Sequence, residues 1–228
     1  MSGVQIPNMQ FRRDGAELFP RALDQDAHAS LLSVLADQPS DVAGSRLFGV
    51  EPLKPFLQPD GPVGSVAARL MRGDPQPVRA ILFDKTPASN WGLGWHQDRV
   101  IAVRERIEVE GFGPWTRKHG ALHVAPPFEV IAAMVTVRVH LDPVAATNAP
   151  LLIAPGSHRF GRIAESSVPG VVRECGVAPC LASPGDIWAY STPILHASER
   201  ASEPKHRRVL QVDYAVGGLP GGLEWMGV

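Results

Sequence analysis

Hydrophobic residues recur at helical spacing only near the start of the chain. Between residues 24 and 37 the apolar side chains of Ala27, Leu31, Leu32 and Leu35 fall on one face, after an Asp-rich first turn. Spacings of three and four residues are typical of an amphipathic helix, and acidic residues favour a helix N-terminus. The pattern predicts a helix over 24–37 and a second, shorter helix over 63–71.

After residue 77 the pattern changes to short β-branched or alternating runs. Each run is bounded by Pro, Gly, Asp or Asn, which are typical of strand ends. Because no long helical run separates them, the strands are expected to pair antiparallel in two layers, as in a jelly roll. The predicted strands cover residues 78–83, 130–141, 150–155, 186–191 and 208–216.

The 228 residues are predicted to form one domain, mainly β with flanking helices (α+β). This length is common for a single all-β domain, and the sequence shows no repeat or low-complexity linker. The predicted parts are a helical flank (1–77), a jelly-roll core (78–216) and a C-terminal tail (217–228). Within the core, residues 99–129 are expected to be a long insertion loop that covers a site.

Charge and cysteine content exclude several partners. The net charge is −1, which gives no basic patch for nucleic acid or for a membrane surface. The longest apolar stretch, 130–141, contains Arg138 and is too short to cross a bilayer. The two cysteines, Cys175 and Cys180, form no disulfide framework, and the first fifteen residues lack the apolar core of a signal peptide. A cytoplasmic protein without a nucleic-acid or membrane partner is expected.

The segment NWGLGWHQDRV carries a candidate metal site. In an extended segment residues i and i+2 point the same way, so His96 and Asp98 can reach one ion. A histidine from a distant strand would complete a face of two histidines and one carboxylate. That face leaves positions for a bidentate cosubstrate and dioxygen, as is typical of non-haem Fe(II) oxygenases.

A second His-x-Asp pair, His140 and Asp142, has a structural interpretation. It ends a predicted strand and runs into Pro143, where a turn explains the aspartate without a metal. Too few strands lie between this pair and His196 to close a jelly roll. The sequence therefore favours His96 and Asp98 as the ligand pair.

His196 is the candidate third ligand. It follows a predicted turn and strand in PGDIWAYSTPILHAS, and the alternative is a half-buried histidine hydrogen-bonded to the backbone. Eleven residues later, Arg207 opens the last strand, where its planar guanidinium suits bidentate capture of a carboxylate. Arg208 adjoins it, but neighbouring residues of a strand point in opposite directions.

Several ordered segments resemble the phytanoyl-CoA dioxygenase family over nearly the whole chain. They are FRRDGAELFPRAL, WHQD, HLDPVAATNAPLLIAPGSHRFG and GDIWAYSTPILHAS, followed by the Arg207 strand that ends at Tyr214. The resemblance implies a double-stranded β-helix, cupin-like, in which His96, Asp98 and His196 bind Fe(II). It also implies that 2-oxoglutarate chelates the iron through its keto-acid end.

The resemblance implies further contacts for this cosubstrate. Its far carboxylate is expected to pair with Arg207, which is favoured over Arg208 by its offset from the distal histidine. Ser198 matches a family position that hydrogen-bonds the cosubstrate, and Thr136 falls where related enzymes place a hydroxyl near the same carboxylate. Gln97 matches a cosubstrate contact of some members.

The chain departs from the family pattern at two places. Ala149 stands where a glycine is usual, and the 99–129 insertion is long. Such insertions tend to face the substrate in this family. Trp115, Lys118 and His123 are therefore expected to contact the substrate.

The expected function is hydroxylation of a small-molecule metabolite with Fe(II), 2-oxoglutarate and O2. Related halogenases have Ala or Gly in place of Asp98, so this carboxylate favours hydroxylation. The alternative is a non-catalytic cupin-like barrel that binds a metal or a small ligand, which would have no use for Arg207 and Ser198. A jelly-roll isomerase or epimerase with acid–base histidines is a third class, and it would not need 2-oxoglutarate.

Overall fold

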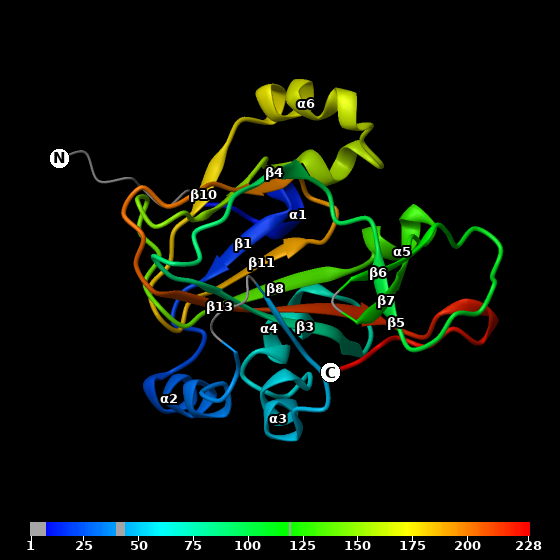
Figure 1. Ribbon diagram of the computed structural model, residues 1–228. Helices are drawn as coiled ribbons and strands as arrows, with labels where there is room; N and C mark the ends of the chain where they lie inside the picture. The colour runs from blue at the N-terminus through cyan, green and yellow to red at the C-terminus, as the bar shows by residue number, and fades with distance from the viewer. Residues whose placement is uncertain (1–7, 40–43, 119) are drawn as a thin grey trace.

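Two antiparallel sheets that face each other form the centre of the molecule (Figure 1). The computed structural model describes residues 8–39, 44–118 and 120–228. The larger sheet contains, in spatial order, β1 (Ala16–Phe19), β11 (Ile187–Ser191), β8 (Val135–His140), β13 (Arg207–Val216), β3 (Pro75–Lys85) and β2 (Ser45–Leu47). The smaller sheet contains β10 (Ala178–Cys180), β9 (Leu151–Ile153), β12 (His196–Ser198) and β4 (Leu93–His96). The predicted double-stranded β-helix is confirmed.

Apolar side chains fill part of the space between the two sheets. Trp188 and Tyr190 of β11 are fully buried and belong to one cluster with Leu151 and Ile153 of β9. Burial of apolar surface stabilises this contact by about 25 cal/mol per Å². The rest of the space is lined by polar residues, described below.

Helices cover the outer face of the larger sheet, at the bottom of Figure 1. They are α2 (Gln25–Val34), α3 (Lys54–Leu57) and α4 (Gly64–Leu70). Asp24 caps α2, because its side chain accepts a hydrogen bond from the backbone N–H of Ala27 at 2.8 Å. Both helices predicted from the sequence are present, and α2 ends three residues earlier than expected.

The remaining helices are short. They are α1 (Phe11–Asp14), α5 (Phe128–Ala132), α6 (Val168–Cys175) and the 3-10 turns η1 (Glu51–Leu53), η2 (Ser157–Phe160), η3 (Glu165–Ser167) and η4 (Pro220–Gly222). In Figure 1, α6 lies on the side of the molecule opposite to α2 and α3. None of the described helices is long and apolar enough to cross a membrane.

The segment 99–129 is folded, and the prediction of a loop there was wrong. Strands β5 (Ile101–Val103), β7 (Ala121–Val124) and β6 (Trp115–Lys118) form a third, antiparallel sheet. Val103 and Val124 pack with Leu223 of the C-terminal segment. Strands of three or four residues are too short for a periodic pattern to distinguish them from a loop.

Only the second half of the segment 130–141, which was predicted to be a strand, forms a strand in the structure. Its first residues belong to α5, and β8 begins at Val135. Within β8 the valines belong to the core under the helices, so Thr136, Arg138 and His140 point between the sheets. This alternation places charged side chains inside the β-helix.

Candidate metal centre and its cavity

Two strands of the smaller sheet bring the predicted metal ligands together. His96 ends β4, His196 begins β12, and the two are partners in the antiparallel register. Asp98 follows two residues after His96. The candidate ligand atoms of these three side chains all lie within 4.8 Å of one another. The fold thus assembles the triad that the sequence predicts.

Hydrogen bonds determine which nitrogen of each histidine faces the site. Nδ1 of His96 lies 2.8 Å from the carbonyl oxygen of Gly94, and Nδ1 of His196 lies 3.0 Å from that of Ile194. A carbonyl can only accept, so Nδ1 carries the proton and Nε2 keeps its lone pair. Burial lowers the pKa of His196 to about 4, although the charge of Asp98 opposes this shift. The imidazole is therefore neutral at pH 7, as a metal ligand must be.

Asp98 supplies the negative charge of the centre. Burial acts to raise the pKa of this carboxyl, but His196 and Arg79 outweigh it and the pKa is lowered. Nη2 of Arg79 lies 3.7 Å from Oδ2 of Asp98, and Nε of Arg79 donates to Oδ2 of Asp213 at 2.5 Å. Arg79 therefore connects the ligand carboxylate to a second, buried carboxylate behind it.

This donor set fits iron(II). Two neutral imidazole nitrogens and one carboxylate match the preference of non-haem iron sites, and three protein ligands leave further coordination positions. The same residues line a cavity of about 450 Å³ between the sheets. A small molecule in this cavity can therefore approach an ion held by the triad.

The second His-x-Asp pair has no place in the centre, as predicted. Asp142 accepts two hydrogen bonds from the Arg208 guanidinium, at 2.9 and 2.8 Å. His140 is buried, and burial together with Arg138 holds its pKa well below the ordinary value. Arg208 is consequently occupied outside the cavity, which agrees with the choice of Arg207.

Two arginines form a positively charged wall in the cavity. Arg207 of β13 and Arg138 of β8 are 3% and 6% exposed, and both line the cavity with the triad. Burial and the charge of Arg138 lower the pKa of Arg207 to about 9. Their hydrogen bonds go to neutral groups, the carbonyl of Ala149 and the amide oxygen of Gln211, and neither has a carboxylate partner among the described residues. Buried cations without a counter-charge cost free energy, which a bound carboxylate would recover.

The carbonyl that Arg207 contacts belongs to a strained turn. Ala149 has a φ of 49°, in the left-handed region that favours glycine. An alanine in this conformation costs about 1 kcal/mol. The strain explains why the usual residue at this position is glycine.

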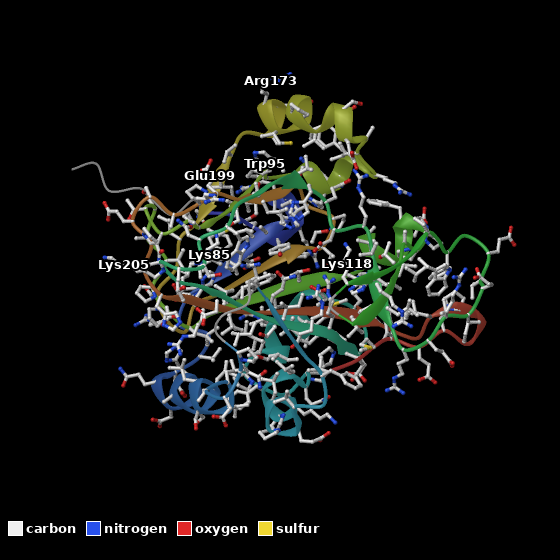
Figure 2. All side chains as sticks on the ribbon, viewed as in Figure 1. Lys85, Trp95, Lys118, Arg173, Glu199 and Lys205 are labelled. Atoms are coloured by element: carbon white, nitrogen blue, oxygen red, sulfur yellow. The ribbon has the colours of Figure 1, made fainter. Side chains whose placement is uncertain are left out.

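Ser198 lies on the cavity wall near Arg207, as expected for a cosubstrate contact. Its hydroxyl accepts a hydrogen bond from Nζ of Lys85 at 3.0 Å, and Lys85 also donates to the carbonyl of Glu199 at 2.8 Å (Figure 2). Lys85 is the register partner of Arg207. Burial, together with repulsion by Arg207 and Arg138, lowers the pKa of Lys85 to about 7. Lys85 thus orients Ser198, and nothing in the sequence singled it out.

Gln97 lines the cavity, but its amide is used by the protein. The amide nitrogen donates to the carbonyls of Gly161 (3.0 Å) and Pro193 (2.8 Å), and the amide oxygen accepts from the N–H of Ile163 at 2.9 Å. Both amide hydrogens are therefore engaged. Gln97 connects the ligand segment to two loops, and its contact with the cosubstrate stays a prediction.

Thr136 lies away from the predicted carboxylate position. Its hydroxyl donates to Oδ1 of Asp213 at 3.0 Å and lies 3.0 Å from the hydroxyl of Thr192. In the strand register Thr136 aligns with Asp213, whereas Arg138, two residues further along β8, aligns with Gln211. Thr136 is not among the residues that line the cavity, and its contact with the cosubstrate stays a prediction.

The three residues expected to contact the substrate separate into two groups. Lys118 and His123 line the cavity. Trp115 packs in the core next to the third sheet (β5, β7 and β6), with the guanidinium of Arg106 5.5 Å from the centre of its ring. The sequence could not separate these residues, since it gave no strand register for this segment.

Several basic residues of the cavity were not predicted from the sequence, among them Arg46, Arg79 and Arg138. Arg138 had a detectable signal, because it stands at an alternate position in the valine-rich run VTVRVH. Arg79 lies on the same face of β3 as Ile81 and Phe83, which line the same cavity. Arg46 lies on a strand of three residues, where no period can be recognised.

The first prediction concerns Arg79. Replacing it with methionine should lower the free energy of unfolding by about 3–5 kcal/mol, because the substitution leaves the Asp213 carboxylate buried without its partner. Urea denaturation at pH 7 measures this change. Arg104→Met is the matched control, since Arg104 pairs with Glu224 on the surface, where a salt bridge contributes about 1 kcal/mol or less. Equal losses in the two variants would contradict a structural role for the Arg79–Asp213 pair.

The fold and the triad define a double-stranded β-helix protein with a metal centre of two histidines and one carboxylate. The sequence profile of the phytanoyl-CoA dioxygenase family matches residues 58–209, more than half of the chain. The chain belongs to this family, whose enzymes are of the iron- and 2-oxoglutarate-dependent type. No match was found among curated protein sequences.

Solved structures share the fold at low sequence identity. EctD from S. alaskensis in its apo form is 20% identical, with a TM-score of 0.70 over 96% of this chain and 78% of that chain. The non-haem α-ketoglutarate-dependent epimerase SnoN from nogalamycin biosynthesis is 16% identical, with a TM-score of 0.65 over 93% and 87% of the two chains. HygX from Streptomyces hygroscopicus, solved with nickel and 2-oxoglutarate, is 14% identical, with a TM-score of 0.61 over 90% and 84%.

Proposed function

We propose that this protein is a non-haem Fe(II)- and 2-oxoglutarate-dependent dioxygenase that hydroxylates a small-molecule metabolite. His96, Asp98 and His196 hold the iron, and Arg207 binds the far carboxylate of 2-oxoglutarate. The cytoplasm is the expected compartment, because a reducing environment suits the two free thiols, Cys175 and Cys180.

The observation that carries this proposal is the pair of buried guanidinium groups in the cavity of the triad. Arg207 and Arg138 have no carboxylate partner among the described residues, although both are almost fully buried. A metal-binding barrel without a cosubstrate gains nothing from this arrangement, and it costs stability. A dicarboxylate that reaches from the metal to the arginines compensates both the metal and the buried charges.

The chain's own residues would position and shield the reactants. Iron held by His96, Asp98 and His196 would, with 2-oxoglutarate bound, supply the oxidative chemistry that uses dioxygen. Arg207, with Arg138 beside it, would set the orientation of the cosubstrate, while Lys85 holds the Ser198 hydroxyl on the same wall. The enclosure between the sheets restricts water and favours productive contact of substrate and oxidant.

Other oxidative reactions, and binding without any reaction, are the alternatives to hydroxylation. The structural neighbours SnoN and SnoK are an epimerase and a carbocyclase that also depend on α-ketoglutarate. The rival outside enzymology is a cupin-like barrel that binds a metal or a small ligand without turnover. The mass of the product separates hydroxylation, which adds one oxygen, from desaturation, which removes two hydrogens.

The second prediction tests the reaction class. Purified protein with Fe(II), 2-oxoglutarate and ascorbate should form succinate slowly without any added substrate, because the cosubstrate and oxygen can react in the absence of a target. Mass spectrometry measures the succinate, and replacement of Fe(II) by Zn(II) should stop its formation. Tight Zn(II) binding with no succinate under Fe(II) would favour the non-catalytic barrel.

A further inference from the structure

A second group of basic side chains lies in the cavity, apart from Arg138 and Arg207. Arg46 reaches the cavity from β2, and Lys118 and His123 reach it from the third sheet. Lys85, beside the proposed cosubstrate anchor, and Lys118 lie toward different ends of the large sheet (Figure 2). The basic residues of the cavity therefore come from two different parts of the fold, and the metal ligands line the same cavity.

Arg46 points into the space between the sheets. It is the register partner of Ile81, which also lines the cavity. The Nε atom of Arg46 is buried and makes no hydrogen bond with a described residue. Burial and repulsion by Arg79 lower the pKa of Arg46. A guanidinium in this state has free donors for an anion.

Electrostatic effects place Lys118 and His123 in the same group. Burial, together with the charges of Arg79, Arg46 and Lys118, lowers the pKa of His123 to about 4, although the hydrogen bond to Ala121 opposes this shift. His123 therefore lies within electrostatic range of both Arg46 and Lys118, and all three side chains line the same cavity.

The charges that line the cavity do not balance. Six basic side chains line it, and Asp98 is the one carboxylate among the described lining residues; the basic residues are Arg46, Arg79, Arg99, Lys118, Arg138 and Arg207. Asp213 compensates Arg79 from behind, and Glu165 pairs with Arg99 at 3.5 Å. Asp98 and the metal-bound carboxylate of 2-oxoglutarate compensate a divalent metal, and the far carboxylate of 2-oxoglutarate compensates Arg207. Positive charge is left on the side of Arg46 and Lys118, even with the cosubstrate bound.

We propose that the substrate is a small anionic metabolite whose carboxylate or phosphate group binds Arg46 and Lys118, in the same cavity as the 2-oxoglutarate anchor but on other strands. This inference rests on the proposed function, because it assigns the second anion to the substrate of the iron centre. The neutral His123 beside this subsite offers Nε2 as a hydrogen-bond acceptor, since its Nδ1 lies 3.1 Å from the carbonyl of Ala121. Charge thus selects the class of substrate, and the cavity of about 450 Å³ limits its size.

The third prediction uses matched pairs of probes on the Ni(II) protein saturated with 2-oxoglutarate. Small carboxylic acids are compared with their primary amides, and phosphate monoesters with their parent alcohols, by calorimetry at pH 7. The anionic member of a pair should bind, and the neutral member should bind at least about tenfold more weakly, as expected for loss of a charge-assisted hydrogen bond. The same pairs are screened with Fe(II) for stimulation of succinate formation, where anions should account for the stimulating compounds.

Variants locate the subsite. Arg46→Met and Lys118→Met should each weaken the best anionic probe by about tenfold or more and leave the Kd of 2-oxoglutarate within about twofold. Arg117→Met is the matched control, because Arg117 neighbours Lys118 on β6, is exposed and does not line the cavity. Neutral probes that bind as well as the anions, no binding of any anion, or unchanged anion affinity in folded Arg46→Met would each overturn the subsite. Failure of 2-oxoglutarate itself to bind the Ni(II) protein is measured first, and it would overturn the proposed function as well.

Discussion

Replacement of His196 by alanine is expected to abolish iron-dependent succinate formation and to weaken metal binding by more than about 100-fold. Loss of a residue that only orients a ligand already costs 10–100-fold in many sites, and His196 is itself a ligand in the proposed centre. The effect should be large because no other described His, Cys, Asp or Glu group joins this cluster. Metal affinity is measured by competition with a chelating dye, and turnover by succinate formation. Asp98→Ala should have the same consequence, since it removes the one carboxylate of the triad.

The matched control is Asp142→Ala, in the second His-x-Asp pair. Asp142 holds Arg208 and lies outside the cavity, so the variant should lose stability and keep its metal affinity. Circular dichroism shows whether each variant is folded before metal binding is compared. Full iron-dependent turnover in folded His196→Ala would remove the triad assignment, whereas loss of metal in Asp142→Ala would move the site to the other pair.

The sequence predicted the elements whose pattern is long enough to be periodic. Strand β13 extends over ten residues and was expected over nearly the same range, and α2 was recognised from its apolar face. The three strands of the third sheet were missed, because each is too short to show alternation and owes its position to packing against the C-terminal segment. The helix α5 was missed for a related reason. A continuous apolar run does not distinguish a buried strand from a short helix.

The candidate site divides in the same way. His96, Asp98, His196 and Arg207 were predictable, because strand periodicity and ordered motifs determine which way they point. Arg138 could have been predicted from the alternation in β8. The positions of Arg46 and Arg79 depend on which strands are neighbours, and that information lies in the sheet order β13-β3-β2. For Thr136 the motif match indicates the face of the strand but not the hydrogen-bond partner, which is Asp213 in the structure.

The Arg207→Met variant should raise the 2-oxoglutarate concentration required for half-maximal turnover by about 10–100-fold. A charge-assisted hydrogen bond to a carboxylate contributes about 1.5–3 kcal/mol, and the methionine keeps most of the side-chain volume while it removes the charge and the N–H donors of the guanidinium. The requirement for the substrate should change far less, because Arg46 and Lys118, not Arg207, are proposed to bind it. Initial rates of succinate formation, with each reactant varied in turn, separate the two effects.

Arg208→Met is the control that the chain provides one residue away. Arg208 is bound to Asp142 outside the cavity, so its loss should lower the melting temperature and leave the requirement for 2-oxoglutarate within about twofold. Arg207→Met, by contrast, should raise the melting temperature of the apoprotein. The charged form of Arg207 is disfavoured by burial and by Arg138, which lower its pKa to about 9, so an apolar replacement removes an unfavourable charge from the apoprotein. A larger effect of Arg208→Met on 2-oxoglutarate would reverse the assignment of the anchor. A folded Arg207→Met protein with an unchanged requirement for 2-oxoglutarate would contradict the assignment of Arg207 as the anchor. The contrast between the two variants therefore tests whether stability was given up at this position for cosubstrate binding.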